Sequence, residues 1–331
     1  MNTTKYLKRG IAFCQCFMLA LLAVSCAKEE APSFFIGTGG LAGNYHSVGS
    51  ALRRILVNDP ATSELQFDER TSSGSVSNIN AITQGEIQFG IAQADHQYQA
   101  VNGLDEWSDG GSQTELRAIF SLYADAVTLV AGADTDIRSM EDLIGKRVDI
   151  GTPGSGTRSN AIDGLHAAGI DWEMDIEVSQ ASLDDRLTMF MRGEIDAFFY
   201  TVGHPNKEIK FATFSVRGAR IIPLDNIDFL IGSSPFYSRV SIPSETYPMA
   251  RHDVDIETIG VYATLLTSAQ VSEDVVYAVT KAVFENVESS TDFRSEFGAL
   301  LSGQYSKGLT APMHPGAVRY YREVGINIPS P

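Results

Sequence analysis

The sequence predicts an α/β protein made of two similar halves. Strand-like and helix-like segments alternate twice along the chain, which favours sheets covered by helices. The chain has 331 residues, more than one hydrophobic core usually organises, so two lobes are expected. Two long β-rich segments flank the second series and can cross between the lobes. We therefore expect each lobe to be a mostly parallel sheet with helices on both faces, and the lobes to be joined by a two-strand hinge.

The first series begins with a buried strand that runs into a glycine turn. The helix after it carries Val48, Leu52, Ile55 and Leu56 on one face, a spacing typical of an amphipathic helix. The second strand ends in small hydroxyl residues and the third in glutamine and aspartate. The elements in order are strand 33–40, helix 44–59, strand 65–75, helix 76–86 and strand 87–95.

The second series opens with a long β-rich run, 116–134, in which a break is expected at Tyr123 to Asp125. As in the first series, the strands end in glycine, hydroxyl, glutamine or aromatic residues. Ligands of open α/β sheets bind beyond such carboxyl ends. The remaining elements are a short capped helix and a strand within 139–157, helix 159–170, strand 176–180, helix 182–194 and strand 195–205.

The last third closes the two lobes. Strand 258–268 could pair with 126–134, which would make these two segments the hinge. Ser272 is a candidate cap for helix 272–289, and Pro315 suits the first turn of a final helix over 314–326. The expected lobes are 27–123 with 265–331 for the first, and 124–264 for the second.

The N-terminus predicts export. A basic start is followed by an apolar run, 11–24, too short for a permanent membrane span, so 1–25 is interpreted as a signal peptide. Cys26 follows Ala-Val-Ser, a pattern typical of a bacterial lipoprotein site, and is the expected lipidation position. Ordinary cleavage after Ser25 or Ala27 is the alternative. The expected location is the periplasm, with a possible lipid anchor.

Composition excludes several functions. All three cysteines lie in the leader or at its end, which leaves the mature chain without a disulfide, a cysteine nucleophile or a thiolate metal site. The formal net charge of −16 argues against nucleic acid or anionic lipid as a partner. A small anionic ligand is still compatible, because a few backbone dipoles can dominate inside a cleft.

The stretch GTPGSGTRSN, 151–160, has the glycines of a phosphate loop, but Thr157 stands where the lysine is needed. Backbone N–H groups from Gly154 to Thr157 at a helix start suit a carboxylate without any lysine. The alternative is that the stretch is only a well-capped helix start. If the carboxylate interpretation is correct, Thr157→Val should weaken binding with little effect on unliganded stability.

None of the candidate catalytic motifs in this sequence has the required residues at the required spacing. Gly37 to Gly43 contains G-x-G-x-x-A, but the acidic residue expected after it comes too late for a dinucleotide site. Ser155 lacks the flanking glycines of a nucleophile elbow. The six histidines are scattered without a metal-binding motif. We therefore predict no enzyme activity, no cofactor and no metal, with an exported hydrolase using Ser155 or His204 as the weaker alternative.

Several stretches together resemble one family. IGTGGLAGNYHSVGSAL, SSGSVSNINAITQGEIQFGIAQAD, LRAIFSLY, SMEDLIGKRVDIGTPGSGTR, IDAFFYTVGHPN and MHPGAVRYYREVGI are similar to the TAXI family. Its members are solute receptors of tripartite ATP-independent periplasmic (TRAP) transporters. The resemblance implies a two-lobed type II periplasmic-binding-protein fold, an ion-gradient-driven membrane permease as partner, usually fused, and a small carboxylate ligand such as glutamate, glutamine or 2-oxoglutarate. An importer driven by ATP (ABC-type) is the alternative partner.

The resemblance also implies which residues line the cleft. Two positions depart from the family pattern: His46 follows Tyr45, and Ala94 lies between Gln93 and Asp95. Asp95 could accept from a ligand ammonium or simply cap its helix. Arg158 and Arg70 are weaker cationic candidates. The expected ligand-binding residues are Thr38, Gly39, Gly40, Tyr45, Ser73, Ser75, Gln93, Asp95, Tyr123, Ser155, Gly156, Thr157, Tyr200, Gly203 and His204.

Overall fold

The computed structural model describes residues 32–41, 43–250, 254–288 and 297–327. The expected signal peptide, 1–25, and the expected lipidation site, Cys26, lie outside the described residues. All the elements below belong to the unit Ser33–Pro331. A search of the described helices for one long and apolar enough to cross a membrane finds none.

The strands alternate with the helices for most of the chain, as predicted. The strands are β1 (Ser33–Gly37), β2 (Gln66–Arg70), β3 (Phe89–Gln93), β4 (Leu116–Gly132), β5 (Arg147–Asp149), β6 (Glu177–Ser179), β7 (Ala197–Val202), β8 (Ala219–Ile222), β9 (Ser238–Ile242) and β10 (Ile256–Ser268). The helices are α2 (Asn44–Asn58), α3 (Ser75–Thr83), α4 (Ala94–Asn102), α5 (Gly156–Ala167), α6 (Leu183–Met191), α7 (Lys207–Phe214), α8 (Ile227–Ser233), α9 (Glu273–Asn286), α10 (Gly298–Leu301) and α11 (Pro315–Glu323). Three short 3₁₀ turns occupy Asp105–Trp107, Glu141–Leu143 and Ser244–Thr246.

The described strands form one open sheet, in the order β2-β1-β3-β10-β4-β7-β5-β6, with β8 beside β4 and β9 beside β10. The pairs β1–β2, β1–β3, β5–β6 and β5–β7 are parallel. Every pair that involves β4 or β10 is antiparallel. The α/β class is confirmed, and the two predicted sheets are joined into one by these two strands.

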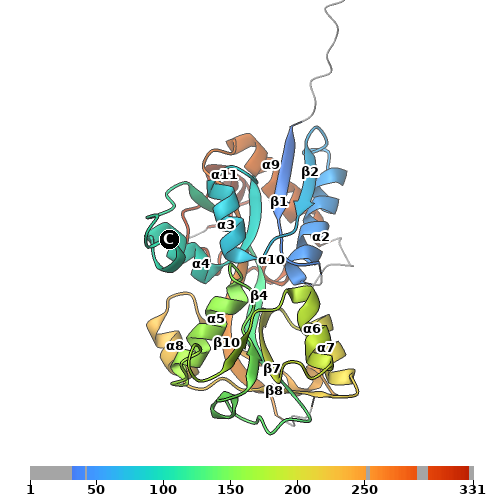
Figure 1. Cartoon of the computed structure of the whole chain (residues 1–331). Helices are drawn as coiled ribbons and strands as arrows, with labels where there is room; N and C mark the ends of the chain where they lie inside the picture. The colour runs from blue at the N-terminus through green and yellow to red at the C-terminus, as the bar shows by residue number, and fades with distance from the viewer. Residues whose placement is uncertain (1–31, 42, 251–253, 289–296, 328–331) are drawn as a thin grey trace, which may run out of the picture. The chain divides into compact units, whose positions relative to one another are not determined.

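The strands β4 and β10 run through both halves of the sheet, the half with β1–β3 and the half with β5–β7, as Figure 1 shows. They pair with each other from Leu116↔Ser268 to Ala126↔Gly260, so β10 pairs with 116–126 of β4, and the predicted partner 126–134 is wrong except at Ala126. The expected break at Tyr123 to Asp125 is absent from this described strand. Register shifts opposite Ala263 to Leu266 absorb the irregularity instead, because a bulge admits an extra residue without ending a strand.

Helices cover both faces of each end of the sheet, as predicted. At one end, α2, α9 and α11 pack apolar residues such as Leu52 and Val279 on one face, and α3 packs Ile79 and Ile82 on the other. At the second end, α5 lies on one face and α6 on the other. The strand ends between these helix layers therefore lie at the middle of the sheet.

Sequence reasoning missed α4, the elements from α7 to β9, and the short helix α10. The helix α4 buries Asp95, His96, Gln97 and Gln99, so its sequence has no apolar stripe. The segment from α7 to β9, 207–242, has short elements whose apolar residues are too few to show a period. Both α4 and the segment 207–242 therefore depend on tertiary contacts for their structure.

Candidate functional site

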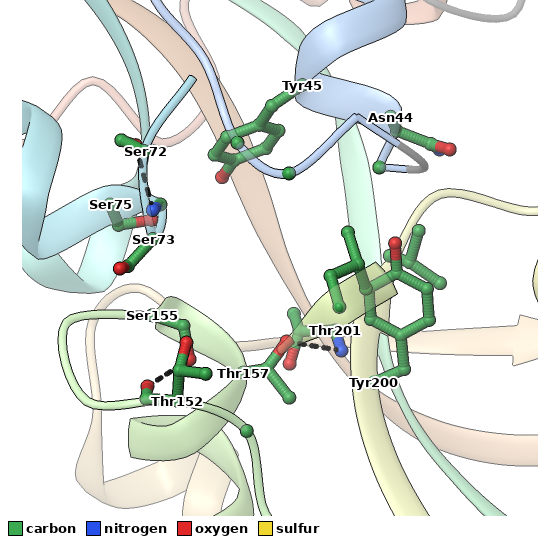
Figure 2. Close-up of a pocket in the computed structure, with 18 of the residues that line it drawn as sticks. Asn44, Tyr45, Ser72, Ser73, Ser75, Thr152, Ser155, Thr157, Tyr200 and Thr201 are labelled. Carbon is green, nitrogen blue, oxygen red and sulfur yellow. Dashed lines mark hydrogen bonds between the residues drawn. The ribbon is translucent and has the colours of Figure 1, made fainter. Parts of the chain in front are cut away.

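A cavity of about 450 Å³ lies between the half of the sheet that contains β1–β3 and the half that contains β5–β7. This volume suits a small organic molecule. Its lining residues come from the carboxyl ends of strands and from the turns that lead into helices. Figure 2 shows Tyr45 from α2, the serines before α3, the start of α5 and Tyr200 of β7 around this space.

Five described helices begin at this cavity. They contribute Asn44 of α2, Ser75 of α3, the residue before α4 (Gln93), Gly156 of α5 and Leu183 of α6. Each helix start carries unpaired N–H groups and the positive end of the helix dipole. These helix ends favour an anion in the cavity, whereas the lining carboxyl groups of Asp125 and Asp184 oppose one.

The start of α5 is built by the turn from Gly151 to Ser155. Gly151 and Gly154 have φ of 88° and 82°, a region that glycine adopts without strain. Ser155 is the N-cap: its Oγ accepts from the Arg158 N–H at 3.3 Å and donates to the Thr152 carbonyl at 2.7 Å. In the described chain, the next two N–H groups, of Gly156 and Thr157, have no protein acceptor and are available to a ligand.

Thr157 links this helix start to the neighbouring strand end. Its Oγ1 accepts from the Thr201 N–H at 3.2 Å, which leaves the hydroxyl hydrogen of Thr157 for another acceptor. The Thr201 hydroxyl is buried and has no hydrogen-bond partner among the described residues. Two hydroxyl groups therefore lie beside the free N–H groups of α5.

The opposite wall is the serine-rich turn before α3. Ser72 Oγ bonds the Thr38 carbonyl at 2.8 Å and accepts from the Gly74 N–H at 2.9 Å. Ser75 Oγ accepts from the Gln93 N–H at 3.2 Å. These bonds hold the turn in place. They leave Ser73 (Figure 2) and Thr71 as exposed residues with a hydroxyl on this side.

One basic side chain lines the cavity among the described residues, and it is neutralised. Arg186 of α6 forms an ion pair with Glu208 at 2.9 Å, and both side chains are buried. Its guanidinium lies 4.0 Å from the centre of the Tyr200 ring. Arg158 lies over the Trp172 ring and Arg70 over Phe35, so neither cationic candidate lines the cavity. Anion binding here must depend mainly on N–H and O–H donors.

An acidic residue that sequence reasoning did not select lies at the floor. Asp125 of β4 lines the cavity and is 1% exposed. Burial, and next the charge of Asp95, raise the pKa of Asp125 well above its ordinary value. Burial and the charge of Asp125 likewise raise the pKa of Tyr45. The sequence feature that could have identified Asp125 is its position, because it falls in the expected hinge strand, two residues after Tyr123.

The structure brings eleven of the fifteen expected site residues to the cavity: Gly39, Gly40, Tyr45, Ser73, Ser75, Gln93, Tyr123, Ser155, Gly156, Thr157 and Tyr200. Sequence reasoning missed Asn44, Thr71, Ser72, Asp125, Thr152, Ser182, Asp184, Arg186 and Thr201. Most of these are polar residues at turns or strand ends, and a wider window around each predicted strand end would have included them.

The other four expected residues lie elsewhere. Thr38 is buried and its hydroxyl donates to the Arg70 carbonyl at 3.1 Å. Asp95 accepts from Asn160 Nδ2 at 2.6 Å and from the His96 N–H at 2.8 Å. Gly203 and His204 line a second cavity of about 520 Å³. Of these, Asp95 has hydrogen bonds that already occupy both of its carboxylate oxygens.

The cavity does not have the arrangement of a hydrolytic site. The Ser155 hydroxyl is held by Thr152, and His204 lies in the other cavity, where Nδ1 bonds the Tyr247 hydroxyl at 2.6 Å. No cluster of three His, Cys, Asp or Glu side chains suited to a metal ion occurs in the part of the chain that the structure describes. The geometry supports reversible binding by hydrogen bonds.

The chain belongs to the NMT1-like family, which matches residues 36–325. Its fold is similar to that of the alkanesulfonate-binding protein SsuA from Xanthomonas axonopodis pv. citri, solved with MOPS. The TM-score is 0.50 and the identity 16%, over 91% of this chain and 86% of that one. A Listeria monocytogenes protein described as an L-cystine ABC transporter has a TM-score of 0.50 and 14% identity, over 84% of this chain and 99% of that one. These likenesses show a shared fold, that of type II periplasmic binding proteins.

Proposed function

We propose that this protein is an extracytoplasmic solute receptor that binds a small carboxylate between its two lobes. The observation that carries the proposal is the convergence of five helix N-termini on one cavity. Their N–H groups can hold an anion without a basic side chain, and release it again without a chemical step. The lobes would be 27–123 with 265–331, and 124–264, as the sequence predicts.

Residues from both lobes approach closely around the cavity, which supports ligand capture by closure. Asn44 Nδ2 donates to the Gly203 carbonyl at 3.2 Å across the two lobes. A Cβ atom on Gly43 would lie 2.9 Å from Leu183 of α6. A ligand held between such surfaces contacts both lobes and stabilises the closed arrangement.

An ABC-type importer is the better-supported delivery route. Of the two solved structures described above, one is described as an alkanesulfonate-binding protein and the other as an L-cystine ABC transporter. Delivery to a TRAP permease rests on the sequence resemblance alone. With either delivery route, the expected signal peptide implies that the receptor lies in the periplasm. It would be anchored to a membrane if Cys26 is lipidated.

Mass spectrometry tests the binding proposal. The protein is purified gently, unfolded, and the released small molecules are identified; a carboxylate at about one molecule per chain is expected. The same compound should raise the free energy of unfolding by about 2.7 kcal/mol at one hundred times its Kd. Stabilisation by sugars or metal ions, with none by carboxylates, would contradict the carboxylate assignment. Turnover of esters or amides would instead favour the hydrolase alternative.

Uptake measurements test the delivery route. In cells that take up the identified compound, collapse of ion gradients with ATP maintained should leave ABC-type uptake intact. Loss of uptake under that condition, with no effect of ATP depletion at a maintained gradient, would favour the TRAP permease.

A further inference from the structure

The cavity contains a buried acidic side chain that a simple carboxylate ligand does not explain. Asp125 is 1% exposed, and neither of its carboxylate oxygens has a hydrogen bond of regular geometry to a described residue. The Gly203 N–H and the Gln93 amide lie close enough to favour the ionised form, but burial outweighs them. A buried carboxylate without a partner is costly, so such groups are normally paired.

The residues facing Asp125 provide no cation. Asp95 of α4, Tyr45 of α2 and Tyr200 of β7 are the titratable groups that interact with it. Arg186 is paired with Glu208 behind the Tyr200 ring. His204, near Gly203, is held neutral because burial lowers its pKa to about 4. No cationic side chain of the described residues therefore balances an ionised Asp125, and a positive group of the ligand would do so.

We propose that Asp125 is the specificity-determining residue of the site and pairs with a protonated nitrogen of the ligand. This inference rests on the proposed function. The carboxylate of the ligand meets the N–H groups of α5, and its ammonium meets Asp125. The substrate class is then an aminated carboxylate. A dicarboxylate or an oxo acid would place a second anion or a carbonyl oxygen beside Asp125, where like charges and lone pairs repel.

Asp95, the residue that the sequence suggested for this role, is less suited to it. Its oxygens accept from Asn160 and from the His96 N–H, and it does not line the cavity. Asp125 has a buried, unpaired carboxylate that does line it. The two residues differ in the one property that ammonium binding needs, a free acceptor at the cavity surface.

The test compares each amino acid with the same acid lacking its amino group. L-glutamate with glutarate, and L-leucine with 4-methylpentanoate, are titrated by calorimetry into the wild-type protein and into Asp125→Asn. In the wild type, any amino acid that binds should do so at least tenfold more tightly than its deaminated partner. A charged hydrogen bond contributes a factor of about ten to a hundred. In Asp125→Asn this ratio should fall toward one, whereas the surface control Asp109→Asn should keep it.

Equal binding of the deaminated acids by the wild type would overturn the role of Asp125 and leave the receptor function standing. Failure of every carboxylate to bind would overturn both. If Asp125→Asn does not fold, the wild type still decides. Pairing with a cation favours ionised Asp125, so amino-acid affinity should rise with pH and binding should release protons. Affinity that falls or stays constant as pH rises over the titration of Asp125 would refute the pairing.

Discussion

The Thr157 hydroxyl accepts a hydrogen bond from the Thr201 N–H at 3.2 Å, and this bond joins the first turn of α5 to the end of β7. Thr201 is 7% exposed, so its N–H has little access to water. The Thr157 hydroxyl is not the cap of α5, which is Ser155. It has a structural role as acceptor and a free hydrogen for the ligand.

Thr157→Val should therefore affect both stability and binding. The variant leaves the Thr201 N–H unpaired, which should lower the free energy of unfolding by about 1–3 kcal/mol. Affinity should fall on the order of tenfold to a hundredfold from the lost donor. Thr157→Ser keeps the hydroxyl and should retain most of both. Thermal unfolding and calorimetry measure the two effects, and an unchanged unliganded melting temperature in Thr157→Val would contradict the structural role.

Gly156→Ala should destabilise the contact between α5 and β3. A Cβ atom there would lie 1.9 Å from Gln93 Oε1, so Gln93 must move from a buried position. Overpacking of this kind costs about 1–3 kcal/mol. The matched control is Gly164→Ala in the same helix, where the nearest atom, of Leu224, is 3.8 Å away. That change should be neutral or stabilising by up to about 1 kcal/mol.

Chemical denaturation of both glycine variants measures the difference. Adding Gln93→Ala to Gly156→Ala should recover part of the lost stability, because it removes the atoms that clash. If the double variant loses as much stability as the two single variants together, or more, the clash is not with Gln93.

Tyr237→Phe should weaken the bridge between α4 and α5. The Tyr237 hydroxyl donates to Asp163 Oδ2 at 2.6 Å and accepts from Asn160 Nδ2 at 2.8 Å. Asn160 in turn donates to Asp95 at 2.6 Å. Loss of the hydroxyl leaves the partly buried Asp163 carboxylate without this donor, at a cost of about 1–3 kcal/mol. Equilibrium unfolding in urea checks this value, and Tyr98→Phe, whose hydroxyl has no such buried network, is the control.

His204 should make the protein less stable in acid. Its Nδ1 forms a hydrogen bond with the Tyr247 hydroxyl at 2.6 Å, and its Nε2 one with Thr128 Oγ1 at 2.9 Å. Burial lowers the pKa of His204 from 6.5 to about 4. Between pH 4 and pH 6.5, His204 is protonated in the unfolded chain and neutral in the folded chain. Its contribution to stability is therefore full above pH 6.5 and is lost as pH falls toward 4.

The variant His204→Gln isolates this effect from the carboxylates with raised pKa, which act in the opposite direction. Relative to the variant, the wild type should lose about 3 kcal/mol of unfolding free energy between pH 6.5 and pH 4. Urea unfolding at a series of pH values gives the comparison. Curves that stay parallel over this range would show that His204 titrates normally in the folded protein.

The sequence by itself determined the α/β class, the order of most elements and several of the helix starts that line the cavity, such as those of α2 and α5. Period-2 and period-3.6 patterns identify elements such as β1 and α2 because one face of each is buried. Capping residues are equally local: Ser272 accepts from the Val275 N–H, and Pro315 begins α11, as predicted. The glycine turn at Gly151 and Gly154 was also readable, since few other residues adopt its backbone angles.

Only the tertiary structure decided which polar residues meet. Asp95 is not free because it accepts from Asn160, which lies 65 residues away in the chain. The pairing of Thr157 with Thr201 and the ion pair of Arg186 with Glu208 likewise join residues from different elements. Hydrogen bonds and desolvation depend on distance in space, and no local pattern encodes them. For that reason the sequence predicted where the cavity lies, and the structure decided which charges it presents.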